Sequence, residues 1–199
     1  MKIIGVTGGV GAGKSEILNA LASDWKAVIV KADEVGHLVM EPSGSCYQPI
    51  IQLFGKDVVA SDGKLDRAKI AACVFGNKEL LEQLNAIVHP AVKAYIKNAI
   101  KQEQEKNTPI FVVEAALLIE DHYDEICDEL WYIYADEATR AQRLQEHRGY
   151  SKEKFAGIFA NQLSEAEFLA HCQFKIDNSG DFEDTKEQIK QRMQMYEIM

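Results

Sequence analysis

Short apolar runs alternate along the chain with longer segments of helical periodicity. The runs of strand length are residues 3–6, 27–30, 110–113, 130–134 and 174–176. A glycine-rich turn after the first run leads into a helical pattern over residues 16–22, and residues 188–196 predict a closing helix. Because the runs are continuously apolar, we expect strands covered on both faces, as in parallel sheets. The pattern therefore predicts an α/β fold with a parallel five-stranded sheet and flanking helices.

Two polar, helix-rich segments interrupt this alternation. Such excursions leave a doubly wound sheet at the carboxyl ends of its strands, where ligands bind. We therefore predict a helical substrate lobe over about residues 40–106 and a lid over about 147–172. The remaining residues, about 1–39, 107–146 and 173–199, form the predicted core of a single domain.

The turn after the first run contains a phosphate-binding motif. Residues 8–15 match G-x-x-x-x-G-K-[ST], with a predicted strand before and a helix after. Glycines let successive amides face phosphate oxygens, Lys14 reaches the β- and γ-phosphates, and the Ser15 hydroxyl ligates Mg²⁺. The spacing predicts binding of a nucleoside triphosphate with Mg²⁺ and a fold of the P-loop NTPase type. The candidate cofactor-binding residues here are Gly8, Gly9, Val10, Gly11, Ala12, Gly13, Lys14, Ser15 and Glu16.

Two carboxylates at predicted strand ends are candidates for chemistry. Asp33 follows the second run, and we expect that strand next to the first one. The Asp33 carboxylate would then lie near the γ-phosphate, where it could accept the proton of an acceptor hydroxyl. An N-cap aspartate of the following helix fits Asp33 equally well. Glu114 ends the third run, where an acidic group commonly holds Mg²⁺; a partly solvated strand-end carboxylate is the alternative.

Composition and the absence of certain motifs argue against several classes of protein. A net charge of −9 and a pI of about 5.1 argue against nucleic-acid binding, which depends on phosphate neutralisation. Asn77-Lys78-Glu79-Leu80 lacks the final aspartate of the guanine-reading motif, which disfavours a GTPase. Four dispersed cysteines indicate reduced thiols, and the N-terminal run is too short for a signal peptide or a membrane span. We expect a cytoplasmic protein without membrane or nucleic-acid partners.

Further short motifs are spread along nearly the whole chain. They are residues 5–15, Ala32-Asp33, Phe54-Gly55, Asp62-Gly63-Lys64-Leu65-Asp66-Arg67, Val74-Phe75, Val88-His89-Pro90, Leu117-Leu118-Ile119-Glu120, Arg143-Leu144, Gln162 and Ile176-Asp177-Asn178-Ser179-Gly180. The combination of D-G-x-L-D-R with H-P and L-L-x-E is far more specific than the phosphate motif. In these residues the chain resembles the dephospho-coenzyme A kinase family nearly end to end.

The resemblance implies transfer of the γ-phosphate of ATP to the ribose 3′-hydroxyl of dephospho-CoA. It implies that Asp33 is the general base, that Lys14 is catalytic, and that Arg67, His89 and Leu117 are substrate-binding candidates in or near a CoA lobe. A surface ion pair with Asp66 or Asp62 is the alternative for Arg67. For His89 the alternative is a structural histidine at a helix end before Pro90.

The predicted lid departs from the family pattern. Ile158 and His147 stand where the family commonly has arginines, and Lys31 replaces a frequent aspartate. Arg140, Arg143 and Arg148 are the candidates for γ-phosphate or adenine contact, of which at least one fits a solvated helix charge. We take Arg140 and Arg148 as the cofactor-binding candidates.

Two other functions share parts of this pattern. Another P-loop kinase, acting on a nucleotide, a nucleoside or a shikimate-like acceptor, would share the core but not the features at residues 62–67 and 89–90. A catalytically inactive nucleotide-binding module would not need Lys14, Ser15 and Asp33 intact. The expected partner is therefore small-molecule dephospho-CoA, with the protein a monomer or a weak homo-oligomer.

Overall fold

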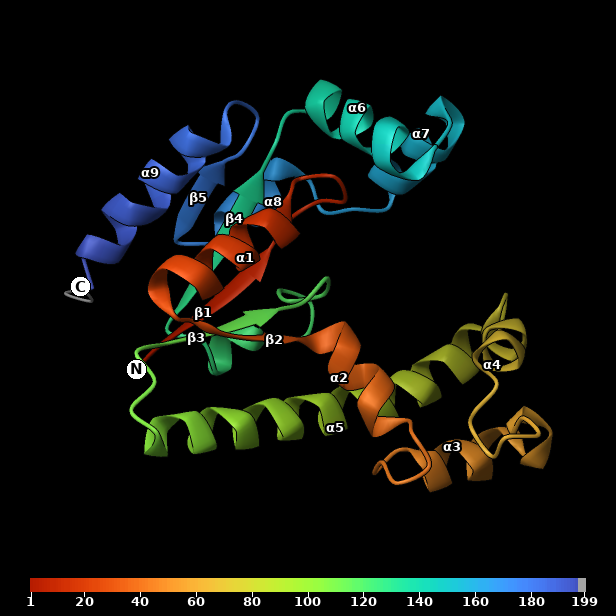
Figure 1. Cartoon of the computed structure of the whole chain (residues 1–199). Coiled ribbons are helices and arrows are strands. Elements are labelled where there is room, and N and C mark those ends of the chain that lie inside the picture. The colour runs from red at the N-terminus through yellow and green to blue at the C-terminus, as the bar shows by residue number, and fades with distance from the viewer. Residues whose placement is uncertain (197–199) are drawn as a thin grey trace. The chain divides into compact units, whose positions relative to one another are not determined.

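A computed structural model of the chain describes residues 1–196 and divides into two compact units (Figure 1). The first unit consists of residues 1–29 together with the chain from residue 103 onward. The second consists of residues 30–102. Within the described residues, no helix is both long enough and apolar enough to cross a membrane.

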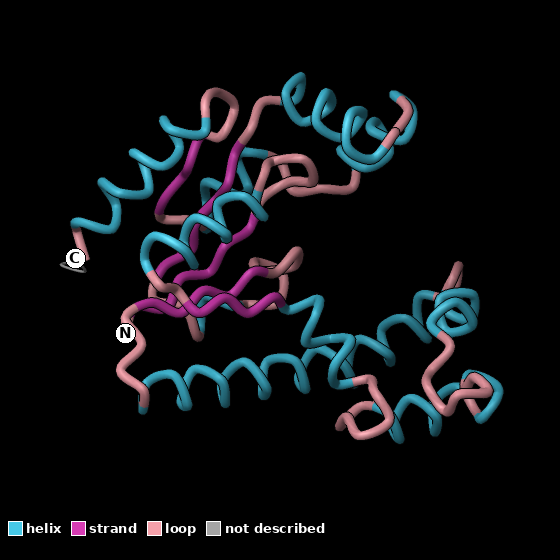
Figure 2. Tube along the Cα trace, in the orientation of Figure 1, coloured by secondary structure: helices cyan, strands magenta, loops and turns pink. Residues whose placement is uncertain are grey.

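The described strands form one five-stranded sheet in the order β2-β3-β1-β4-β5 (Figure 2). Their bounds are Lys2–Thr7 (β1), Val28–Lys31 (β2), Ile110–Glu114 (β3), Glu129–Tyr134 (β4) and Phe174–Asp177 (β5). β1 pairs in parallel with both β3 and β4, and β4 pairs in parallel with β5. The predicted α/β fold class is confirmed. The expectation that the second strand lies next to the first is wrong, because β3 lies between them.

The core of the first unit lies between one face of the sheet and two helices. These are α1 (Lys14–Trp25) and α9 (Phe182–Gln194). Trp131 of β4 is fully buried in this core, whereas the next residue, Tyr132, stacks on Phe168 with ring centroids 4.4 Å apart. Successive strand residues face opposite sides. The sheet is therefore covered on both faces, as its continuous apolar runs predict.

Helix α9 begins earlier in the chain than its apolar periodicity predicts. Asp181 is its N-cap, and the Asp181 carboxylate accepts a hydrogen bond from the Glu183 amide at 2.9 Å. The first turn is polar, with Glu183 and Asp184 near the positive end of the helix dipole. Apolar periodicity misses such a turn because capping, rather than burial, stabilises it.

The predicted lid segment of the first unit is helical. It follows α6 (Glu137–Arg148), whose N-cap Asp136 accepts hydrogen bonds from the Thr139 amide and hydroxyl. The segment itself contains α7 (Lys152–Ala160) and α8 (Glu165–His171). Ser164 and Glu167 form a capping box at the start of α8.

The second unit is helical, and the role of residues 40–106 as a substrate lobe stays a prediction. Its helices are α2 (Ala32–Val39), α3 (Tyr47–Phe54), α4 (Arg67–Val74) and α5 (Lys78–Glu105), of which α5 ends just beyond the unit. Pro90 lies inside α5, so the alternative that His89 is a structural histidine at a helix end is wrong. Val92 and Ile96 of α5 are buried. The packing of this apolar face stabilises the long helix on both sides of Pro90.

Candidate active site

The phosphate motif forms a tight loop between β1 and α1. Gly8 has φ +151°, and a Cβ there would lie 2.3 Å from the Ile133 carbonyl oxygen, so the loop passes too close to β4 for a side chain. Gly13 is the N-cap of α1, with φ +86° in the left-handed region. Gly13 has no side chain to cap the helix, and the Glu16 amide of the first turn donates to the Gly13 carbonyl oxygen at 3.1 Å. A helix N-terminus of this kind favours an anion.

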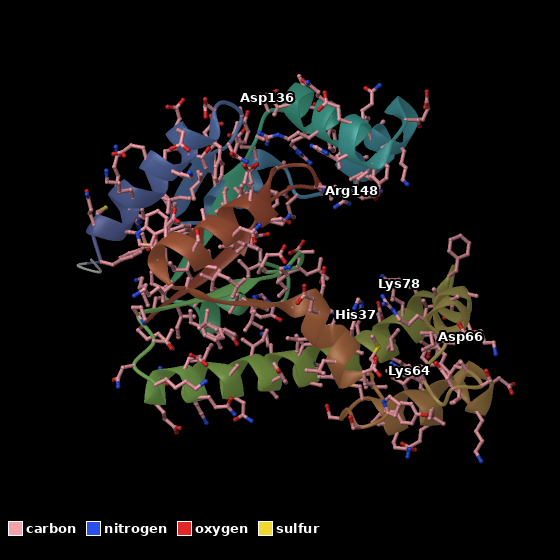
Figure 3. All side chains as sticks on the ribbon, viewed as in Figure 1. His37, Lys64, Asp66, Lys78, Asp136 and Arg148 are labelled. Atoms are coloured by element: carbon pink, nitrogen blue, oxygen red, sulfur yellow. The ribbon has the colours of Figure 1, made fainter. Side chains whose placement is uncertain are left out.

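A cavity of about 560 Å³ lies over this loop. Its lining residues all belong to the first unit and are Gly9, Val10, Gly11, Ala12, Gly13, Lys14, Ser15, Glu16, Glu114, Arg143, Leu144, His147 and Arg148. Arg148 ends α6, as labelled in Figure 3. The cations Lys14, Arg143 and Arg148 therefore share one cavity with the loop amides and with two carboxylates, those of Glu16 and Glu114. This arrangement suits a polyanion with a bound cation.

Lys14 and Glu114 lie together in the cavity. The Lys14 ammonium donates a hydrogen bond to the Gly8 carbonyl oxygen at 2.8 Å and lies 4.0 Å from a Glu114 carboxylate oxygen. Their side chains are 19% and 15% exposed, so water screens the pair only partly. The hydroxyl of Ser15 and the carboxylate of Glu114 are hard oxygen donors in the same cavity, which fits the preference of Mg²⁺.

Arg140 lies beside the loop but is not among the described residues that line the cavity. Its Nε donates to the Val10 carbonyl oxygen at 2.9 Å, and its Nη2 donates to the Gln162 side chain. The guanidinium also lies over the Phe159 ring, 4.1 Å from the centroid. Burial lowers the pKa of Arg140. The Arg140 guanidinium thus links the phosphate loop to the segment between α7 and α8. Binding of Arg140 to the nucleotide stays a prediction.

Arg143 lines the cavity, although the predicted cofactor-binding arginines are Arg140 and Arg148. Its Nη1 is buried and has no hydrogen-bond partner among the described residues. A buried donor without an acceptor is costly, which is a reason to expect a ligand oxygen there. Helical spacing alone does not distinguish Arg143 from Arg140. Arg140, Arg143 and His147 are three and four residues apart and share one face of α6.

Asp33 belongs to the second unit, in the first turn of α2. The N-cap of that helix is Lys31, so the alternative that Asp33 caps it is wrong. The Asp33 side chain is exposed and therefore accessible to a ligand. Its predicted role as a base toward the phosphate loop stays a prediction.

Arg67, another predicted substrate residue of the second unit, is the first residue of α4. The Asp66 carboxylate caps the helix through the Ala68 and Lys69 amides, and lies 3.9 Å from the Lys69 ammonium. Asp62 accepts a hydrogen bond from the Lys64 amide. The carboxylates named as ion-pair partners for Arg67 are therefore engaged by other groups.

Arg67 lines a cavity of about 220 Å³ within the second unit. The other lining residues are His37, Met40, Glu41, Lys64 and Leu65. Figure 3 labels His37 on α2 and Lys64 on the turn before α4. Lys64 pairs with Glu41 at 2.9 Å, which neutralises part of the charge and leaves the cavity cationic overall. This cavity is a second candidate anion site.

The remaining predicted substrate residues lie apart in the chain. His89 is half-buried within α5 of the second unit. Leu117 lies in the turn after β3 of the first unit and is 45% exposed, whereas its neighbour Leu118 is fully buried. An exposed leucine beside a buried one suits an apolar ligand contact, but exposed leucines are common on protein surfaces. Both roles stay predictions.

Comparisons with known proteins agree with this geometry. The family model described as dephospho-CoA kinase matches residues 2–184. The dephospho-CoA kinase of Carboxydothermus hydrogenoformans is 35% identical over 189 residues, covering 95% of this chain and 91% of that protein. That of Corynebacterium diphtheriae is 32% identical over 183 residues, covering 90% of each.

Solved structures share the fold. A crystal structure of a Thermus thermophilus protein superposes with a TM-score of 0.80 at 26% identity, covering 98% of this chain and 97% of the other. Dephospho-CoA kinase from Campylobacter jejuni superposes with a TM-score of 0.72 at 23% identity, covering 98% and 96%, which indicates the fold alone. Because the family model spans most of the sequence and the relatives align over nearly their whole length, the chain belongs to the dephospho-CoA kinase family.

Proposed function

We propose that this protein transfers the γ-phosphate of ATP to the ribose 3′-hydroxyl of dephospho-CoA, giving CoA and ADP in the last step of CoA synthesis. Family membership supports the overall reaction. The observation that carries the proposal is the cavity of about 560 Å³, in which the phosphate motif meets cations from α6. Phosphoryl transfer needs positioning and charge stabilisation more than covalent chemistry, and this cavity has the groups for both.

ATP would place its phosphates against the amides of residues 8–16, with Lys14 at the β- and γ-phosphates. Arg143 supports this placement because its buried Nη1 needs an acceptor and a phosphate oxygen supplies one. Arg148 lies in the same lining and would bind the phosphates as well. Arg140 would act here through Val10, whose carbonyl it holds, and direct contact with the nucleotide would require it to leave that bond.

Mg²⁺ would be held by the Ser15 hydroxyl and, directly or through water, by the Glu114 carboxylate. When bound, the ion neutralises charge on the β- and γ-phosphates. The distance of 4.0 Å between the Glu114 carboxylate and the Lys14 ammonium supports this assignment, since both groups then serve the same phosphates.

Asp33 would accept the proton of the 3′-hydroxyl as its oxygen attacks the γ-phosphorus, and ADP would leave. Its exposed place on α2 supports a role toward a bound ligand rather than in the core. Arg67 would bind the pyrophosphate of dephospho-CoA with its planar guanidinium, and Lys64 in the same cavity would add a second cation. His89 and Leu117 would contribute further contacts to the acceptor.

The working state that we propose is a cytoplasmic monomer or weak homo-oligomer that needs no nucleic acid. The acidic composition, with a net charge of −9, supports the absence of a nucleic-acid partner. The four cysteines all lie within the described residues and are free thiols, which fits a reducing compartment.

A panel of acceptors tests the proposal. Purified protein is supplied with MgATP and, in separate reactions, dephospho-CoA, adenosine, AMP or shikimate, and ADP release is followed. We expect fast turnover with dephospho-CoA alone and background rates with the Lys14→Ala variant. Preference for adenosine, AMP or shikimate would refute the substrate, and ATP binding without turnover of any acceptor would indicate a binding module instead.

A further inference from the structure

Side chains hold the carbonyls of alternate residues around the phosphate loop. Lys14 binds the Gly8 carbonyl oxygen at 2.8 Å, Arg140 binds that of Val10 at 2.9 Å, and Asn178 binds that of Ala12 at 2.8 Å. Lys14 belongs to the motif itself. Asn178, in contrast, is 166 residues away in the sequence, and nothing in the proposed chemistry uses it.

Asn178 lies in the loop between β5 and α9 and is 1% exposed. Its backbone amide donates to the Tyr134 carbonyl oxygen at 2.8 Å, which fixes the residue to the end of β4. Its side-chain oxygen accepts a hydrogen bond of 2.9 Å from the hydroxyl of Thr185, a fully buried residue of α9. Because a carboxamide oxygen can only accept, the Thr185 hydroxyl directs the NH₂ group toward Ala12.

This contact determines the direction of one amide in the loop. The peptide unit is planar and trans, so the Ala12 carbonyl and the Gly13 amide, which belong to the same unit, point in opposite directions. Holding the carbonyl on Asn178 therefore turns the Gly13 N–H away from Asn178. Gly13 lines the cavity of the phosphate loop, so its amide is available to an anion there.

The fit at Gly13 is too close for any other residue. A Cβ on Gly13 would lie 2.2 Å from the Asn178 Nδ2, in addition to the strain of φ +86°. The glycine of the motif is thus required by two independent features, its left-handed backbone and the buried amide packed against it. The Asn178 side chain is built into the wall of the loop.

We propose that Asn178 is a positioning residue for ATP, which holds the Ala12–Gly13 peptide with the Gly13 amide facing the triphosphate, and that Thr185 orients Asn178. The inference rests on the proposed binding of ATP at residues 8–16. A brace that only stabilises the packing of α9 is the competing interpretation. The two differ in what they predict for ATP affinity in a folded variant.

Isosteric variants separate the two interpretations. Asn178→Asp replaces the donor by a carboxylate oxygen that repels the Ala12 carbonyl, and Thr185→Val removes the orienting hydroxyl at nearly constant volume. Thr185→Ser keeps the hydroxyl and serves as the conservative rescue. Asn98→Asp, on an exposed position of α5, is the matched control for the same change of amide to carboxylate.

For each protein, MgATP binding is measured by calorimetry, together with kcat, the KM values of both substrates and the melting temperature. We expect Asn178→Asp to weaken ATP binding about tenfold or more, as for the loss of a buried hydrogen bond together with a repulsive contact. The KM of dephospho-CoA should stay within about twofold, since the acceptor is not bound by the loop amides. Thr185→Val should weaken ATP binding about threefold, and Thr185→Ser and Asn98→Asp should match the wild type.

Wild-type ATP affinity in a folded Asn178→Asp protein, with only the melting temperature lowered, would overturn the inference. If Asn178→Asp does not fold, the Thr185 pair decides: equal ATP affinity in Thr185→Val and Thr185→Ser overturns it, and a selective loss in Thr185→Val supports it. Failure of the wild-type protein to bind MgATP would instead refute the proposed function itself, a result that is distinguishable from an unaffected variant.

Discussion

Replacing Arg143 by methionine should lower activity without lowering stability. The Arg143 Nη1 is buried without a hydrogen-bond partner among the described residues, and the side chain lines the ATP cavity. Methionine is flexible and of similar length, so it fills the space of the stem without placing a donor there. The substitution removes a contact that exists only when a ligand is bound.

The magnitudes follow from this geometry. A buried donor without an acceptor costs about 1–3 kcal/mol, so removing it should leave the free energy of unfolding unchanged or raise it by about 1 kcal/mol. A hydrogen bond to a charged phosphate is worth about 1.5–3 kcal/mol, so kcat/KM for ATP should fall by about 10- to 100-fold. Chemical denaturation and ADP-release kinetics measure the two quantities on the same preparation.

Arg192→Met is the matched control, because the Arg192 guanidinium forms a structural ion pair with Glu129. Its Nε donates to the Glu129 carboxylate at 2.8 Å, and Glu129 is 5% exposed. Without the guanidinium, the buried Glu129 carboxylate keeps its hydrogen bond from the Tyr196 hydroxyl but loses its cationic partner. This loss should lower the free energy of unfolding by about 3 kcal/mol. The melting temperature should fall by about 6–12 °C, with the KM of ATP unchanged.

The opposite pattern would refute this reasoning. Wild-type kinetics in Arg143→Met, or a loss of stability there as large as in Arg192→Met, would mean that the Arg143 guanidinium serves the fold. An increased KM of ATP in folded Arg192→Met would mean that the two arginines cannot be separated into ligand-binding and structural groups.

Three further perturbations test other parts of the site. Lys14→Ala should reduce ADP release to background, since the loop loses its ammonium; measurable turnover with dephospho-CoA would contradict the role of that cation. Asp33→Asn should lower kcat about 100-fold or more and leave MgATP affinity within about twofold, and a near-normal rate would exclude a general base at this position. Burial raises the pKa of the Cys127 and Cys172 thiols to about 12, so at pH 8 they hold almost no thiolate, and iodoacetamide should label exposed Cys73 first. The order of labelling is measured by peptide mass spectrometry, and early modification of Cys127 in the folded protein would contradict the raised pKa of its thiol.

The elements that form the site could be predicted because their causes are local. Continuous apolar runs predicted the strands to within a residue or two at their ends, and the motif at residues 8–15 has a single strand-loop-helix geometry that accommodates its glycines. Both signals lie within about 20 residues of chain, which is the range over which periodicity and glycine conformation act.

Long-range relations could not be predicted in the same way. The connection from β2 to β3 passes through the whole helical unit, and no local pattern reveals that β3 returns to lie between β2 and β1. Polar contacts across the fold, such as that of Asn178 with Ala12, likewise leave no periodic signal. The preference for Arg140 over Arg143 had the same cause, because the two differ in tertiary contacts rather than in sequence context.

Purified protein incubated with dephospho-CoA and ATP carrying a radioactive γ-phosphate tests the proposed reaction most directly. We expect label to appear in a product that co-migrates with CoA, and a 3′-nucleotidase to release that label completely. The same reaction with Lys14→Ala should give no labelled product. Label that remains on ATP, appears only as inorganic phosphate, or resists the 3′-nucleotidase would contradict transfer to the ribose 3′-hydroxyl.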